Sequence, residues 1–424
     1  MRHSMNLVKV VSVFTLVMIG VASCSTLTTT HSPTVQTSTP RSLDQQYLGD
    51  AQLVTSTAIG SPVANDRYVF WIDARNPQIS NQKIYQNTTV YGFDALNQKE
   101  FVVSKASEFP NRSELVADGG RVAWTIWSDA GQVIQSYSVA SNQIVDVARL
   151  AAPAVNSLFI DKDTLYYVVM SGGSSNLIAY NLNNGKSQLV RSLGNVVNFF
   201  VRDEVLIWHE DMTSDGIGSS ALYMASLTNP SSRTLIRKVQ GDIYGYTMLN
   251  NSIIYGCACY NGGIYVYNVI TKATSIYPAN IVSKPVSNST YAAWMSTKGS
   301  GQQQQINMVR IEDIGDVANK VFTTTTFLNR YADVVGFVSN DKLAFTSKNE
   351  ASMTRSVYLI TSTLVSEGTI QDDIHHPEAC DGRPRNCGQV VAVEDELRDY
   401  NTALVMLLMA TRVCLLTPLF TPLP

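Results

Sequence analysis

Charged residues are scarce in this chain of 424 residues: Asp, Glu, Lys and Arg make up 15% of it, against roughly a quarter in an average soluble domain. The 31 basic and 34 acidic residues give a formal net charge of -3, so the basic excess of a nucleic-acid-binding domain is missing. With five histidines in total, a metalloenzyme built on several histidine ligands is hard to assemble. Hydrophobic residues nevertheless reach 45%, which excludes disorder throughout the chain.

Signatures of catalysis are missing as well. No Gly-x-Ser-x-Gly nucleophile elbow occurs in the sequence. Residues 216–221 have the spacing of a dinucleotide-binding glycine pattern, but they open a strand pattern, so no helix N-terminus is available for a phosphate. We therefore predict no catalytic residue, no cofactor and no metal site, and we favour a protein that is not an enzyme.

The first 24 residues have the organisation of an export signal. Arg2 and Lys9 accompany an apolar run from Val10 to Val21, which has the length of a signal-peptide core and is short for a membrane span. The run ends in the sequence VASC, which resembles the lipobox of bacterial lipoproteins. The resemblance implies cleavage before Cys24, lipid attachment to Cys24, and an anchor in the cell membrane or outer membrane. An ordinary secretory signal with a chance cysteine is the alternative.

Composition divides the remainder of the chain into three parts. Residues 25–42 contain 11 Ser or Thr and no acidic residue, a composition typical of a flexible tether. We predict a signal peptide over residues 1–23, the tether over 24–49, a folded domain over 50–372 and a tail over 373–424.

Beyond residue 50 one strand pattern recurs seven times. A polar turn precedes a triplet of apolar residue, any residue and aromatic residue. The residues at the third position are Trp71, Trp124, Tyr167, Trp208, Tyr255, Trp294 and Phe345. Their spacings of 39 to 53 residues are close to the roughly 40–45 residues of one propeller blade.

This repeat predicts an all-β fold, a β-propeller with seven four-stranded blades, with six or eight as alternatives. Radial stacking buries both apolar faces of each blade, and strand alternation directs the repeat aromatic rings between blades. We expect residues 52–57 to close the ring by pairing with the last blade.

Residues 67–100 resemble the repeat of TolB-like propellers. The matching residues are Trp71, Asp73, Arg75 and Asn76, followed by Val90–Asp94. The resemblance implies a propeller fold. TolB itself has an α/β pattern ahead of its propeller and six repeats, whereas this sequence shows no such pattern and seven repeats, so we do not extend TolB's partners to this chain.

Propeller connectivity places two kinds of segment on one rim, which we call the loop rim: the loops between the second and third strands of each blade, and the links between blades. Recognition residues on a rigid scaffold tend to lie in such loops. The predicted ligand-binding residues of this rim are Asp73, Arg75, Trp127, Asp129, His209, Glu210, Asp211 and Tyr260, with Asp215 and Lys298 beside them. Mixed charges and aromatic rings suit a protein or an envelope glycan, and solvated loops without a ligand are the alternative.

The functional prediction combines anchor and propeller: a lipid-anchored module outside the cytoplasm that binds or scaffolds a protein or glycan at the bacterial envelope. A propeller-type polysaccharide hydrolase or lyase that uses loop carboxylates is the alternative. The sequence His209-Glu210-Asp211 could hold a cation, although one histidine beside acids is more typical of a surface loop.

The six cysteines include two pairs of interest. Cys257 and Cys259 alternate along one strand, and we expect buried apolar residues there because a mutual disulfide at that spacing is strained. Cys380 and Cys387 lie in a loop-like stretch, where an exported location favours a disulfide. Free thiols, or a metal site with the neighbouring histidines 375 and 376, are the alternatives. The tail then continues into an apolar segment, residues 391–416, that is expected to form a helix.

Overall fold

We analysed a computed structural model of the chain. It describes residues 51–73, 89–104, 109–110, 115–128, 131–150, 155–171, 174–194, 196–212, 218–259, 262–281, 283–298, 303–317, 321–323, 328–329, 332–348 and 354–361. The chain divides into two compact units, residues 1–369 and 370–424, and all described residues belong to the first. The predicted signal peptide, tether, tail helix, Cys24 and the pair Cys380–Cys387 lie outside the described residues.

Antiparallel strands make up nearly all of the described structure. One seven-stranded sheet has the order β27-β28-β29-β1-β2-β3-β4. Its strands are β1 (Gln52–Asn65), β2 (Tyr68–Asp73), β3 (Thr89–Asp94), β4 (Lys99–Ser104), β27 (Asp333–Phe337), β28 (Lys342–Lys348) and β29 (Arg355–Thr361).

The next two sheets along the chain are smaller. In the five-stranded sheet the order is β5-β7-β8-β9, and β6 also pairs with β7. Its strands are β5 (Phe109–Pro110), β6 (Val116–Asp118), β7 (Arg121–Ser128), β8 (Gly131–Ser138) and β9 (Gln143–Leu150). The four-stranded sheet consists of β10 (Val155–Asp161), β11 (Thr164–Ser171), β12 (Ser174–Asn181) and β13 (Ser187–Leu193) in sequence order.

A second seven-stranded sheet follows, with its strands in sequence order. They are β14 (Val196–Arg202), β15 (Val205–Asp211), β16 (Ser219–Ser226), β17 (Asn229–Leu249), β18 (Ser252–Cys259), β19 (Gly263–Asn268) and β20 (Thr274–Pro278). The six-stranded sheet centres on β23 (Tyr291–Lys298) and β24 (Gln303–Arg310). Short strands flank this pair: β21 (Asn280–Ile281), β22 (Val286–Ser287), β25 (Phe322–Thr323) and β26 (Leu328–Asn329). A 3-10 helix, η2 (Ile311–Asp316), follows β24.

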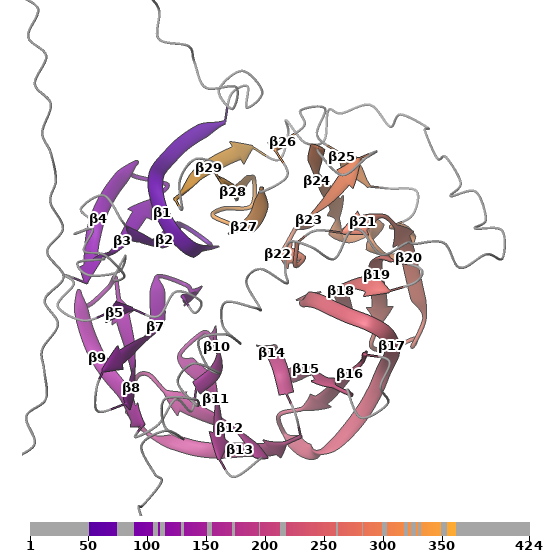
Figure 1. Ribbon diagram of the computed structural model, residues 1–424, viewed down its shortest axis with the longest axis horizontal. Helices are drawn as coiled ribbons and strands as arrows, with labels where there is room; N and C mark the ends of the chain where they lie inside the picture. The colour runs from indigo at the N-terminus through magenta and orange to yellow at the C-terminus, as the bar shows by residue number, and fades with distance from the viewer. Residues whose placement is uncertain are drawn as a thin grey trace, which may run out of the picture. The chain divides into compact units, whose positions relative to one another are not determined.

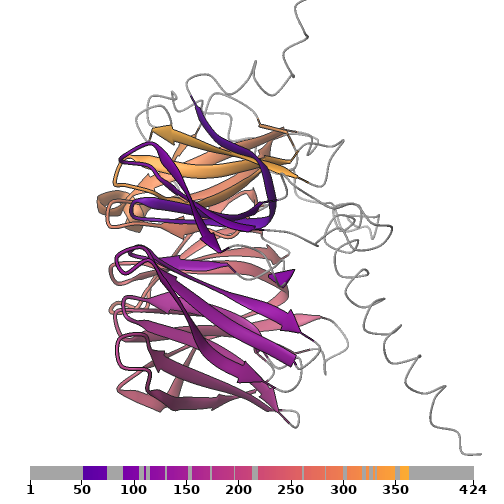
Figure 2. The ribbon, with the colours of Figure 1, turned by 90° about the vertical axis from the view of Figure 1, so that its left-hand side faces the viewer.

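The sheets of this unit succeed one another in chain order around a central axis (Figure 1). Turned by 90°, neighbouring sheets lie against each other as layers (Figure 2). The unit is therefore a β-propeller, as the repeat predicted. Among the described residues no helix has the length and hydrophobicity needed to span a membrane.

Two long strands each pair with strands of two neighbouring sets. The first part of β1 pairs with β29, through partners such as Gln52 and Leu359, and its second part pairs with β2. This confirms the expectation that residues 52–57 pair with the last strands of the propeller. Strand β17 likewise passes from β16 to β18 at Gly241, which has a φ of +114°. Each of these two strands therefore links two neighbouring sets of strands.

The repeat aromatic residues pack as the alternation predicted. In four sets the ring stacks on the directly opposite tyrosine of the next strand, at centroid distances of 5.2 to 5.9 Å; the pairs are Trp71–Tyr91, Trp208–Tyr223, Tyr255–Tyr265 and Phe345–Tyr358. Each such pair contributes about 0.5–1.5 kcal/mol beyond the burial of its area. Trp208 also shares a core cluster with Val168 and Leu177 of the preceding sheet, so these rings fill the space between sheets.

Candidate functional site

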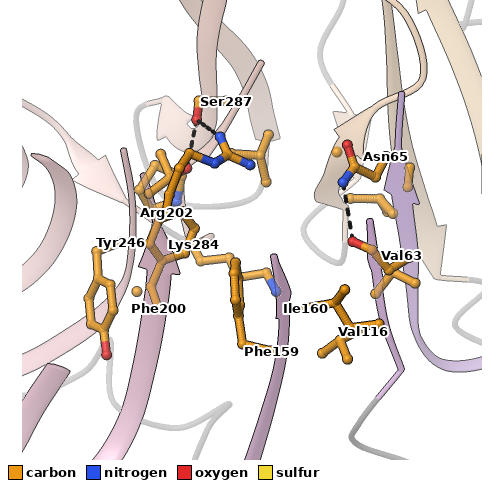
Figure 3. A pocket seen from close by; sticks show the side chains of 18 of the residues that line it. Val63, Asn65, Val116, Phe159, Ile160, Phe200, Arg202, Tyr246, Lys284 and Ser287 are labelled. Carbon is orange, nitrogen blue, oxygen red and sulfur yellow. Dashed lines mark hydrogen bonds between the residues drawn. The ribbon is translucent and has the colours of Figure 1, made fainter. Parts of the chain in front are cut away.

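A cavity of about 330 Å³ lies among the innermost strands (Figure 3). Its lining comes from β1, β6, β10, β14, β17, β22 and β27 and from residues next to them. The cavity therefore follows the axis around which the sheets are arranged, and we call it the axial cavity. Each inner strand begins at the loop rim and ends at the tight turn that leads to its second strand.

Two cationic side chains line the axial cavity. Arg202 ends β14 and donates weakly through Nη1 to the Met248 carbonyl oxygen at 3.4 Å and to Ser287 Oγ at 3.5 Å. Lys284 precedes β22, is exposed, and extends into the cavity in Figure 3. Among the described residues, neither cation forms a salt bridge with a carboxylate. Both therefore retain donors for a ligand.

The remaining wall combines amides, hydroxyls and aromatic rings. Asn65 donates through Nδ2 to the Ala117 carbonyl oxygen at 3.2 Å, and Ser157 Oγ lies 2.9 Å from Asn198 Oδ1. Phe159 also lines the cavity. Pockets for small polar ligands commonly combine apolar surface with a few placed hydrogen-bonding groups. The arrangement suits a ligand that carries both an anionic group and hydroxyl or amide groups.

Four aspartates follow the ends of cavity-lining inner strands: Asp66, Asp118, Asp161 and Asp203. Burial raises the pKa of Asp66, and the charge of Asp118 raises it further, whereas Arg202 opposes both effects. Burial also raises the pKa of Asp161, again against Arg202. The backbone N–H of Lys162 donates to Asp118 Oδ2 at 2.5 Å. Carboxylates therefore gather near Arg202 at the turn end of the cavity.

An aspartate with a buried side-chain oxygen lies toward the opposite end of the cavity. Asp333 begins β27, and its Oδ1 is buried without a hydrogen-bond partner in the described part of the chain. Burial raises the pKa of Asp333 to about 6, against the charges of Lys284 and Arg355. No group of three or more His, Cys, Asp or Glu among the described residues could hold a metal ion.

The predicted rim residue Asp73 has a structural role. It is the last residue of β2 and is 2% exposed. Its Oδ2 accepts hydrogen bonds from Trp71 Nε1 at 2.8 Å and Thr57 Oγ1 at 2.7 Å. The carboxylate therefore joins the repeat tryptophan to the neighbouring strand β1.

The predicted cluster His209-Glu210-Asp211 also belongs to a strand, β15, rather than to an exposed loop. His209 is 5% exposed, its ring meets Tyr246 edge-on at 5.8 Å, and burial lowers its pKa to about 4. Glu210 accepts a hydrogen bond from Trp208 Nε1 at 2.9 Å. Asp211 is half-buried and pairs with Ser220. The expectation of an exposed loop is corrected: alternation on β15 directs the imidazole into the core.

Two of the other predicted rim residues lie in strands, and four lie outside the described residues. Trp127 lies in β7 and Lys298 ends β23. Four further predicted residues fall outside the described part of the chain, namely Arg75, Asp129, Asp215 and Tyr260. Sequence reasoning did not find the axial cavity, because its residues come from seven separate strands with no local signature.

Cys257 and Cys259 correct a second expectation. They are joined by a disulfide within β18, with their Cα atoms 5.3 Å apart. Cys257 is buried, as expected, but Cys259 is half-buried at the end of the strand that faces the loop rim. Alternation places both side chains on one face of the sheet, where the two sulfur atoms can meet.

No family model and no curated protein sequence matches this chain. Solved structures do resemble it. A prolyl endopeptidase has a TM-score of 0.53 at 11% identity, covering 74% of this chain and 49% of its own. The β-propeller domain of the Trilobed protease from Pyrococcus furiosus has a TM-score of 0.52 at 7% identity, covering 75% and 98%. An oligogalacturonate lyase in complex with manganese has a TM-score of 0.51 at 10% identity, covering 73% and 92%.

These similarities establish the fold and nothing finer. All three identities are far below the level at which activity is shared, and propellers host many unrelated functions. The chain spans about half the length of the prolyl endopeptidase, so that enzyme's activity does not transfer to it.

Proposed function

We propose that this chain is an exported, lipid-anchored β-propeller that binds an acidic group of a glycan or protein at the bacterial cell envelope, with the axial cavity as its binding site. The observation that carries the binding proposal is the position of Arg202 and Lys284 in the cavity wall without a salt-bridge partner among the described residues. The sequence VASC and the Ser/Thr-rich segment after it support the export and the anchor.

Charge and geometry favour a carboxylate over a neutral ligand. A guanidinium offers parallel N–H donors that match a carboxylate, and such charge-assisted bonds are stronger than neutral ones. The two hydrogen bonds that Arg202 makes are long, so a carboxylate can replace them at little cost. Lys284 adds a second positive charge on the side of the loop rim, which attracts an anion as it enters.

The volume limits what can enter. About 330 Å³ is at the lower end of ligand-pocket sizes, which suits one sugar ring or one amino-acid side chain rather than a long polymer segment. Aromatic faces such as Phe159, and amides such as Asn198, would contact the apolar face and the hydroxyls of a sugar. The TolB-like repeat at Trp71 and Asp73 supports a propeller scaffold and does not identify the ligand.

The proposal is tested with the full-length acylated protein in detergent micelles. Uronic-acid oligosaccharides and acidic peptides are titrated by calorimetry, each beside its neutral counterpart. We expect only the acidic probes to bind, and Arg202→Gln or Lys284→Gln to weaken binding at least tenfold, the scale of one lost charge-assisted bond. Lys186→Gln, an exposed lysine between β12 and β13, is the control with unchanged affinity. Equal binding of neutral and acidic probes, or unchanged affinity of both cavity variants, contradicts the proposal.

A second candidate function rests on the aspartates at the turn end of the cavity. Raised pKa values of Asp66 and Asp161 suit a general acid, and the neighbouring Asp118 carboxyl group is the candidate base or nucleophile. A polysaccharide hydrolase or lyase is therefore the alternative. It predicts release of reducing ends or unsaturated sugars from envelope polysaccharide. Activity lost in Asp66→Asn but kept in Asp341→Asn, an exposed turn aspartate, would favour this alternative.

A further inference from the structure

The disulfide between Cys257 and Cys259 closes a very short loop, in which Ala258 is the one residue between the two cysteines. A disulfide stabilises a fold mainly by restricting the unfolded chain, and this effect grows with the length of the loop that it closes. A loop over one residue restricts the unfolded chain little. Strand β18 is in any case held by β17 and β19 on either side. This disulfide therefore adds little to the stability of the fold.

The surroundings of the pair leave room for a reactant. Cys259 is half-buried and ends β18 at the loop rim, whereas Cys257 is 1% exposed. The residue opposite Cys259 on β17 is Gly241, and the residue opposite Cys257 on β19 is Gly263. Neither glycine places a side chain beside the sulfur atoms. Of the two sulfur atoms, that of Cys259 is therefore the one that a small thiol can approach.

The two sulfur atoms differ in their surroundings. Cys259 Sγ lies 3.7 Å from the Tyr265 hydroxyl. Cys257 lies within the apolar cluster that contains Ile243 and Ile253, and the half-buried Cys259 packs against this cluster. The two sulfur atoms are therefore unequal, with Cys259 the accessible one.

We infer that Cys257 and Cys259 form a thiol–disulfide exchange site that a small dithiol reduces while the propeller remains folded. A thiolate of the dithiol attacks Cys259 Sγ, the S–S bond breaks, and Cys257 leaves as a thiolate that takes up a proton. The second thiol then attacks the dithiol's own sulfur in the mixed disulfide and releases Cys259 as a thiol. Two electrons and two protons pass to the protein, and the dithiol becomes a cyclic disulfide. This inference is independent of the proposed ligand.

The test uses full-length protein in native buffer. Dithiothreitol is added, the exchange is stopped with acid, and the protein is then unfolded, alkylated and digested for mass spectrometry. We expect the peptide with Cys257 and Cys259 to be reduced to the same extent with and without urea during the dithiothreitol step. Oxidised glutathione then restores the disulfide, and the thermal midpoint of the protein changes little between the two forms. Reduction that requires urea would show a purely structural disulfide and overturn the inference.

Matched variants test which sulfur atom is attacked. In Cys257→Ser the remaining Cys259 forms a mixed disulfide with oxidised glutathione in the folded protein. In Cys259→Ser the remaining Cys257 is buried, and we expect its reaction to be at least tenfold slower, as for thiols in apolar surroundings. Circular dichroism confirms folding of both variants. If either variant fails to fold, the reduction of the wild-type disulfide with and without urea tests the inference. Equal rates in the two variants would contradict the assignment of Cys259 as the attacked sulfur.

Discussion

The indole Nε1 of Trp71 donates a 2.8 Å hydrogen bond to Asp73 Oδ2, two residues further along β2, where both side chains are buried. The same relation recurs between Trp208 and Glu210 at 2.9 Å on β15. A side chain two positions along a strand lies on the same face, so the repeat places the carboxylate next to the tryptophan ring. These acids, which sequence reasoning assigned to ligand binding, therefore satisfy the polar atom of a core tryptophan.

Replacing Asp73 tests this structural role. Asp73→Ala leaves the buried Trp71 indole without its acceptor and removes one of the two hydrogen bonds of the Thr57 hydroxyl, and an unpaired buried donor costs about 1–3 kcal/mol. We expect the free energy of unfolding to fall by about 3 kcal/mol, as measured by urea denaturation. Asp73→Asn keeps one acceptor oxygen and should lose less. The exposed Asp341→Ala is the control, and a similar small loss in both alanine variants would contradict the prediction.

His209 makes stability depend on pH. Burial lowers its pKa to about 4, whereas the unfolded chain has the ordinary value of about 6.5, so between these values the unfolded state binds more protons. The contribution of His209 to stability is complete above pH 6.5 and is lost as the pH falls toward 4, by about 3 kcal/mol. His209→Phe should remove this part of the pH dependence. Urea denaturation between pH 7 and pH 4 measures it, and parallel profiles of wild type and variant would contradict it.

Asp333 has the opposite dependence. Its folded pKa is about 6 and its ordinary value 3.8, so between these values the folded state binds more protons, and stability falls as the pH rises through this window. At pH 7 the carboxylate is ionised where burial disfavours it. Asp333→Asn should therefore raise the free energy of unfolding by about 3 kcal/mol at pH 7 and change it little at pH 3.5. An equal effect at both pH values would show that the charge is not responsible.

The lipid anchor is tested at Cys24. Because the proposed acyl chains supply the membrane affinity, Cys24→Ala should abolish labelling by a fatty-acid probe and move the protein from the membrane fraction to the soluble exported fraction. Ser25→Ala, which keeps the acceptor thiol, is the matched control. Membrane retention of Cys24→Ala without lipid label would exclude the anchor.

The periodic parts of this protein were predictable because they depend on local rules. The alternation around Trp71, Trp208 and Tyr255 indicated strands whose aromatic rings pack between sheets, and the recurrence of the triplet indicated a propeller. The pairing of residues 52–57 with the last strands followed from closure, since an unpaired final set would leave an open sheet edge. Each inference needed only residues within one repeat, or the count of repeats.

The residues of the site were not predictable in the same way. His209 looks like an exposed loop residue beside two acids, and its burial depends on the second half of β17, which contributes Tyr246. Cys257 and Cys259 looked like apolar core residues, and their different exposure depends on where β18 ends relative to β17 and β19.

By itself, the amino-acid sequence determined strand periodicity, the repeat and the propeller fold, because strand alternation and burial of aromatic side chains act over short distances along the chain. The tertiary structure alone decided which side chains meet at the axis. Arg202 and Lys284 are 82 residues apart in sequence, and they line one cavity because successive sheets turn around a common centre. That relation exists only once the sheets have packed against one another.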